Sequence, residues 1–174
     1  LMYSTASEQL LRFFPAGKNA RPRCTLASFG VFNRNYVKSG YGALIKKFYE
    51  AKRDNNPHVS VWGSGKAIRD FLYVRDGAEG ILRAGAVYEE IEPLNIATGV
   101  GVSIKELAEI IRDIVGYRGE IFYDTTKPDG HLKRVFGIEL MKQKLNLAPQ
   151  TSIAKGIEET VAWFTQHYEE AIKY

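Results

Sequence analysis

From residue 41 onward, the sequence alternates between short segments with the pattern of β-strands and longer segments with the pattern of α-helices. The clearest helix follows Ser103, which forms a capping-box pattern with Glu106 before apolar residues recur at spacings of three and four. Helices are also predicted over residues 44–51, over residues 77–86 with Asp76 as the cap, and after Ser152. Strands are predicted over residues 23–29, 59–62, 94–97 and 120–123. This alternation is typical of an α/β protein with a largely parallel sheet.

Composition narrows the classes of function. The chain has 174 residues, of which 45% are hydrophobic, so a packed core is expected. There is no apolar run long enough for a membrane span, and the net charge of +4 is not gathered into the basic stripe of a nucleic-acid-binding protein. Cys24 is the only cysteine, which predicts a reducing, cytoplasmic location. His58, His131 and His167 lack the spacing of metal ligands and are expected at the surface, so no metal site is predicted.

One ordered string carries information about function. Val61-Trp62-Gly63-Ser64-Gly65 ends a predicted strand, and Arg69-Asp70-Phe71-Leu72-Tyr73-Val74 follows shortly after it. Two glycines after a strand let the backbone approach a ligand closely. The planar guanidinium of Arg69 can bind a diphosphate through paired hydrogen bonds. Taken singly, such a glycine pair often only ends a strand, and the whole string is more specific.

This string resembles extended short-chain dehydrogenases of the NAD-dependent epimerase/dehydratase family that act on nucleotide sugars. Further segments are similar to the GDP-L-fucose synthases within that family. They are Ala43 to Ala51, Asn95 to Ala108, Val115 to Gly119, and Asp124 with Lys127-Pro128-Asp129-Gly130. The resemblance covers residues 38 to 168 and is closest to the carboxyl-terminal portion of those enzymes. It implies a Rossmann-like α/β fold, with residues 1–40 as a remnant of the Rossmann domain and residues 41–174 as a small substrate-binding α/β domain.

The resemblance also implies a site. Matched position by position, the substrate contacts of the family fall on Lys47, Trp62, Arg69 and Asp129. Lys47 and Arg69 can offset phosphate charge, and Trp62 can present an aromatic face. Asp129 can accept hydrogen bonds from sugar hydroxyls or from the base. Each residue alone also fits an ordinary structural place: a tryptophan in the core, a solvated lysine or a turn.

The amino-terminal segment matches the family less well. The family catalyses with a Tyr-x-x-x-Lys pair, which places Tyr3 as the candidate catalytic tyrosine and Ser7 where the lysine is expected. Serine carries no charge and cannot lower the pKa of the tyrosine. The sequence also has no Gly-x-x-Gly-x-x-Gly turn for a dinucleotide pyrophosphate. NADP is the cofactor of the intact family, and we expect that this chain alone does not bind it.

Three functions remain open. The first is a GDP-sugar epimerase/reductase that converts GDP-4-keto-6-deoxy-mannose to GDP-L-fucose with NADPH, present here as a fragment that retains mainly GDP-sugar binding. The second is a non-catalytic module that binds nucleotide sugars or pairs with a second copy or a full-length subunit. The third is another NAD-dependent nucleotide-sugar epimerase or dehydratase. None of them involves nucleic acid or a membrane.

Overall fold

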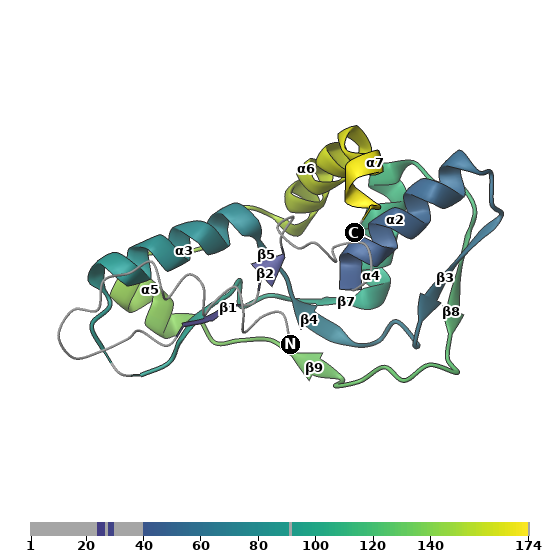
Figure 1. Ribbon diagram of the computed structural model, residues 1–174. Helices are drawn as coiled ribbons and strands as arrows, with labels where there is room; N and C mark the ends of the chain where they lie inside the picture. Colours follow the sequence, from purple (N-terminus) through teal and green to yellow (C-terminus); the bar gives the residue numbers. More distant parts are fainter. Residues whose placement is uncertain (1–23, 27, 30–39, 91, 174) are drawn as a thin grey trace. The chain divides into compact units, whose positions relative to one another are not determined.

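The computed structural model describes residues 24–26, 28–29, 40–90 and 92–173 (Figure 1). These residues form two compact units that interleave along the sequence. Unit 1 contains the described residues of 24–29, 70–100 and 135–151, and unit 2 contains those of 40–69, 101–134 and 152–173. Both units contain strands and helices, as the α/β prediction requires.

Unit 1 pairs short strands in parallel and packs two helices with them. β1 (Cys24–Leu26) pairs with β6 (Leu94–Ile96), and β2 (Ser28–Phe29) pairs with β5 (Leu72–Tyr73). The helices are α3 (Val74–Val87) and α5 (Glu139–Leu145). Their buried faces meet the strands in one hydrophobic core, formed by Leu72, Ala84, Tyr88, Leu94, Ile96, Ala97, Ile138, Met141 and Leu145. Burial of these apolar side chains is the main force that holds the unit together.

A buried carboxylate organises the loops of unit 1. Asp70 is only 9% exposed, and its Oδ1 accepts hydrogen bonds from Thr98 N at 3.0 Å and from Thr98 Oγ1 at 2.5 Å. Its Oδ2 accepts from Gly99 N at 2.9 Å and from Phe136 N at 3.5 Å. Both oxygens are therefore satisfied, which a buried carboxylate requires. Through these bonds Asp70 fixes the segments that follow β6 and precede α5.

Unit 2 packs three helices and two groups of strands. The helices are α2 (Gly40–Arg53), α4 (Ile104–Val115) and α6 (Ile153–Gln166), followed by the short α7 (Tyr168–Ala171). β3 (His58–Trp62) pairs in parallel with β8 (Glu120–Asp124). β4 (Ile68–Asp70), whose last residue belongs to unit 1, lies between β7 (Gly101–Ser103) and β9 (Lys133–Arg134). The core includes Ile45, Phe48, Val61, Leu107, Ile111, Ile157 and Phe164.

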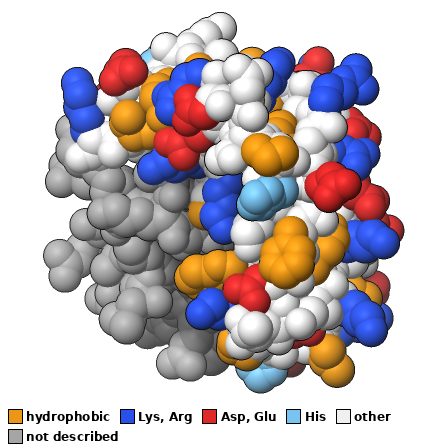
Figure 2. Space-filling model, turned by 90° about the vertical axis from the view of Figure 1, so that its right-hand side faces the viewer, with side chains coloured by type: hydrophobic (Ala, Val, Ile, Leu, Met, Phe, Trp, Pro, Cys, Tyr) orange, Lys and Arg blue, Asp and Glu red, His pale blue; other side chains and the backbone are white. Residues whose placement is uncertain are grey.

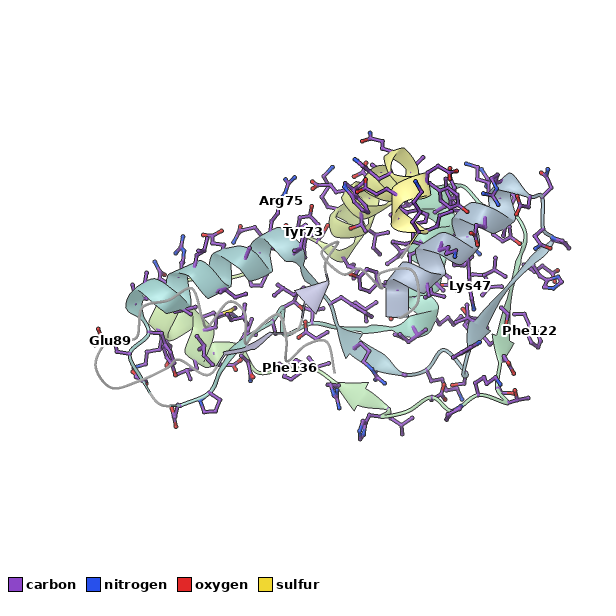
Figure 3. The ribbon with its side chains drawn as sticks, viewed as in Figure 1. Lys47, Tyr73, Arg75, Glu89, Phe122 and Phe136 are labelled. Atoms are coloured by element: carbon purple, nitrogen blue, oxygen red, sulfur yellow. The ribbon has the colours of Figure 1, made fainter. Side chains whose placement is uncertain are left out.

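The β3–β8 pair alternates between its two faces. Val59 and Val61 are buried, whereas Trp62 and Phe122 are 69% and 59% exposed. Phe122 projects outward from β8 (Figure 3). This period of two is the pattern of a sheet with one covered face.

The helix expected after Ser103 is α4, and its predicted cap is confirmed. Ser103 Oγ accepts from Glu106 N at 3.1 Å, and Glu106 Oε2 accepts from Ser103 N at 2.8 Å. At the other end Gly116 has φ 73°, a left-handed conformation that favours glycine. Lys52 of α2 donates to Val115 O at 2.7 Å, so a cation from a neighbouring helix satisfies a terminal carbonyl.

We expect the charge of Glu106 to stabilise α4 in a pH-dependent way. Donation by the Ser103 hydroxyl, and then by its backbone N–H, lowers the pKa of Glu106 below its ordinary value. A carboxylate with a lowered pKa in the folded state adds stability above the unfolded pKa and loses it as the pH falls through the folded pKa. Glu106→Gln keeps a capping-box acceptor but no charge. Its urea midpoint should lie below that of the wild type at pH 7, and the difference should shrink below about pH 4.3. If the urea midpoints of the variant and the wild type differ by the same amount at pH 7 and below about pH 4.3, the explanation is contradicted.

One predicted helix start is wrong. Asp76 does not cap a helix from residue 77: α3 begins at Val74, with Tyr73 at the N-cap position and no side-chain cap. Asp76 Oδ2 instead accepts from Thr151 N at 3.0 Å. The carboxylate therefore ties the first turn of α3 to the segment that precedes α6.

Other predicted elements are found with shifted bounds. The helix predicted over residues 44–51 is α2, which is longer at both ends, and the helix after Ser152 is α6, capped by Ser152. Of the three histidines, His58 and His131 are exposed, whereas His167 is part-buried and stacks on Trp163 at 4.8 Å between ring centroids. Among the helices that the structure describes, none is both long and apolar enough to cross a membrane. The predicted boundary at residue 40 stays a prediction, because most of residues 1–40 lie outside the described ranges.

Candidate functional site

An exposed tryptophan lies close to two lysines at the carboxyl end of β3. Trp62 is 69% exposed, although large aromatic side chains are usually well buried. Lys47 Nζ lies 5.7 Å from the Trp62 ring centroid, and Lys127 Nζ lies 6.0 Å from it. Lys47 belongs to α2 (Figure 3), and its Nζ donates to Ser60 O at 2.8 Å. An exposed aromatic ring flanked by cations can bind a planar group that carries negative charge nearby.

Next to Trp62, a tight turn packs against the loop after β8. Gly63 has φ 83°, and a β-carbon added there would overlap Asp129 Oδ1. Ser64 N donates to Asp129 Oδ1 at 2.6 Å, and Ser64 Oγ donates to Asp129 Oδ2 at 2.7 Å. The Ser64 side chain, and then its backbone N–H, lower the pKa of Asp129, with smaller effects from Lys66 and Arg69. Asp129 is therefore held as a carboxylate against the turn.

Arg69 lies on β4, close to Gly130 of the same loop. Its Nη1 donates to Ile68 O at 2.8 Å, and its Nη2 would lie 3.8 Å from a β-carbon placed at Gly130. Its Nε and Nη2 make no hydrogen bond to another described residue. Part of the guanidinium fork is thus available for an anion.

The basic side chains of this cluster make no direct ion pairs within the described part of the chain. Lys47, Lys66, Arg69 and Lys127 form no ion pair with another residue of the described ranges. Burial lowers the pKa of Lys47, because partial loss of water disfavours the ammonium form. A bound anion would offset that cost. In the face drawn in Figure 2, basic, acidic and apolar side chains are interspersed, so no continuous basic stripe crosses it.

The structure brings the four predicted substrate residues into unit 2: Lys47, Trp62, Arg69 and Asp129. Lys47 contacts Trp62, and the loop of Asp129 contacts the turn after Trp62 and approaches the side chain of Arg69 at Gly130. Sequence reasoning missed two participants. Ser64 lies in a glycine-rich turn and Lys127 in a second turn, and neither turn pattern alone indicates a role in the site.

Other predicted features are not tested by this geometry. Tyr3 and Ser7 lie outside the described residues. Within residues 40–90 and 92–173 there is no Gly-x-x-Gly-x-x-Gly turn. Nor do the described residues contain a group of three or more His, Cys, Asp or Glu side chains that could hold a metal ion.

Comparison with known proteins agrees with this picture. Residues 20–97 match the model of the NAD dependent epimerase/dehydratase family. The chain is 38% identical to "Putative GDP-L-fucose synthase 2" of Arabidopsis thaliana over 125 residues, which cover 72% of this chain and 38% of the relative. It is 34% identical to the GDP-L-fucose synthase of Escherichia coli K12 over 136 residues, 73% of this chain and 42% of the relative.

Solved structures agree on the fold. A GDP-L-fucose synthetase from Naegleria fowleri bound to NADP superposes with a TM-score of 0.79 at 27% identity, covering 97% of this chain and 53% of that one. The structure is thus that of part of a Rossmann-like short-chain dehydrogenase. The chain spans about two-fifths of the length of the curated relatives it matches and about half of the solved structures. On these grounds, residues 20–97 match the NAD dependent epimerase/dehydratase family, and the chain is a homologue of GDP-L-fucose synthases over part of their length.

Proposed function

We propose that this chain binds the nucleoside diphosphate part of a GDP-sugar through unit 2, as part of an epimerase/reductase of the GDP-L-fucose synthase type. The observation that carries the proposal is the group of basic side chains around exposed Trp62, which form no ion pair with another described residue. Trp62 supplies a face on which a base can stack, and Lys47, Lys127 and Arg69 supply positive charge for the diphosphate. The names of the curated relatives support GDP as the nucleotide.

The reaction itself belongs to the proposal. In the intact family the product would be GDP-L-fucose, with hydride from NADPH and proton exchange through a tyrosine, for which Tyr3 is the candidate. The residue at position 7 favours a second candidate function, in which this chain by itself is a non-catalytic module. Ser7 replaces the lysine of the Tyr-x-x-x-Lys pair, which supports GDP-sugar binding, or pairing with another subunit, without reduction.

We further propose a cytoplasmic location and that NADP is not bound by this chain alone. The single Cys24 supports a reducing compartment, and the sequence supplies no glycine-rich turn for the cofactor. The third hypothesis, a related NAD-dependent epimerase or dehydratase, differs in the nucleotide that it would bind.

Calorimetric titration of the chain with GDP, UDP-glucose and NADPH tests the proposal. We expect GDP to bind, with UDP-glucose weaker and NADPH showing no binding. Arg69→Ala should weaken GDP binding about tenfold or more, because a charge-assisted contact to phosphate is lost. Arg112→Ala is the matched control, since Arg112 lies on α4 of the same unit and pairs with Asp113 at 2.8 Å. GDP binding that Arg69→Ala leaves intact would contradict the site. Tighter binding of UDP-glucose would favour the third hypothesis, and self-association without nucleotide binding would favour the second.

A further inference from the structure

A further carboxylate lies beside Trp62, on the neighbouring strand. In the parallel pair of β3 and β8, Trp62 is in register with Asp124, the last residue of β8. Paired residues of neighbouring strands project from the same face of a sheet, so Asp124 lies on the face that exposes the indole of Trp62. Asp124 itself is partly exposed. A planar group stacked on Trp62 would therefore have a carboxylate at its edge.

The two oxygens of the Asp124 carboxylate differ in their partners. Oδ1 accepts hydrogen bonds from Thr126 N at 3.1 Å and from Thr126 Oγ1 at 2.5 Å, and these bonds orient the side chain. Oδ2 accepts no hydrogen bond from another described residue. The Thr126 hydroxyl, and then its backbone N–H, lower the pKa of Asp124, and the charge of Lys127 lowers it further. Asp124 is therefore a carboxylate at neutral pH, and its Oδ2 can accept from a ligand.

The charge of Asp124 restricts which part of a nucleotide can lie next to it. A carboxylate repels phosphate oxygens and attracts the N–H groups of a base. Guanine carries two kinds of donor on one edge, the N1–H and the 2-amino group. Uracil carries an N–H between two carbonyl oxygens and has no amino group. The 2-amino group is thus the donor by which a carboxylate can distinguish guanine from uracil.

We propose that Asp124 determines specificity for guanine, with its Oδ2 accepting a hydrogen bond from the 2-amino group of a base stacked on Trp62. The inference rests on the proposed GDP-sugar function and names the residue that selects its base. The neighbouring lysines and Arg69 would face the diphosphate, and Asp124 would face the uncharged base. A site that accepts a hydrogen bond from one group of its ligand discriminates against an analogue without that group, because the acceptor is left unpaired.

Asp124→Asn should change the base that the site prefers. Because Thr126 donates to Oδ1, the asparagine should keep its oxygen there and place its NH2 group where Oδ2 lies. That NH2 group opposes the 2-amino group of guanine and matches the 2-oxo group of xanthine. Calorimetry should show GDP binding weakened about tenfold and xanthosine diphosphate bound about tenfold more tightly than by the parent. The control Asp113→Asn, an exposed aspartate on α4, should retain the preference for GDP. Unchanged GDP affinity in Asp124→Asn, or no gain for xanthosine diphosphate, would overturn the inference.

A second measurement uses the parent protein alone and does not depend on the folding of a variant. Inosine diphosphate keeps the N1–H of GDP but lacks the 2-amino group, so the parent should bind it about tenfold more weakly than GDP. Equal affinities for the two nucleotides would overturn the role of Asp124 and leave the proposed GDP-sugar function standing. If the parent binds neither nucleotide, the proposed function itself fails, and the inference fails with it.

Discussion

Asp70→Asn is expected to lower the free energy of unfolding by about 2–3 kcal/mol, since hydrogen bonds to a buried charged group are among the strongest in a protein. The carboxylate accepts from two donors at each oxygen: Thr98 N and Oγ1 at one, Gly99 N and Phe136 N at the other. An asparagine side chain must direct its NH2 group toward one of these two pairs of donors. The N–H groups of the amide then face backbone N–H groups, and neither has an acceptor. A buried donor without an acceptor costs the desolvation of that group.

Urea denaturation followed by circular dichroism measures this effect. Asp113→Asn is the control, because its side chain is 67% exposed and its pair with Arg112 is solvated, so a change within about 0.5 kcal/mol is expected. An equal, small effect of the two substitutions would show that the hydrogen bonds of Asp70 contribute little net stability.

The largest expected effect on binding is that of Trp62→Ala. Loss of a stacked base should weaken GDP binding about 10- to 100-fold, because base–aromatic stacking contributes about 1–3 kcal/mol per base. Stability should change little, since Trp62 is mostly exposed and loses little buried area on truncation. Trp62→Phe should recover part of the affinity, because a smaller aromatic face remains.

Trp163→Phe is the matched control for this substitution. It alters the only other tryptophan, which lies in α6 and stacks on His167. GDP affinity should stay within about twofold of the parent in this variant. If Trp62→Ala binds GDP as tightly as the control, Trp62 is not part of the site.

Local features of this fold were predictable and long-range ones were not. Ser103 and Glu106 are three residues apart, so their capping box is visible in the sequence and is found in the structure. Asp76 also has the residue type of a cap, but its hydrogen-bond partner is Thr151, 75 positions away. No local pattern distinguishes these two uses of a carboxylate. The hydrogen bond between Ser64 and Asp129 also joins residues far apart in the sequence, by 65 positions, and no local pattern reveals it.

Element length explains the remaining differences. β5 and β9 have two residues each and β4 and β7 have three, too few to show a period of two. α5 has seven residues, about two turns, and likewise lacks a visible apolar repeat. For the candidate site, family resemblance supplied Lys47, Trp62, Arg69 and Asp129, because the motifs that contain them are ordered along the chain. The flanking Lys127 and the bridging Ser64 emerge only from spatial contacts.

The interleaving of the two units has a consequence for synthesis. The amino-terminal part of a chain leaves the ribosome first, and domains fold as their residues emerge. The described residues of unit 1 are complete once Thr151 has emerged. Unit 2 still lacks α6 at that moment, and with it the buried side chains of Ile157 and Phe164. The loops that carry Trp62, Arg69 and Asp129 are therefore translated well before the hydrophobic core that supports them is complete. The proposed nucleotide site would have this support only after α6 has left the exit tunnel.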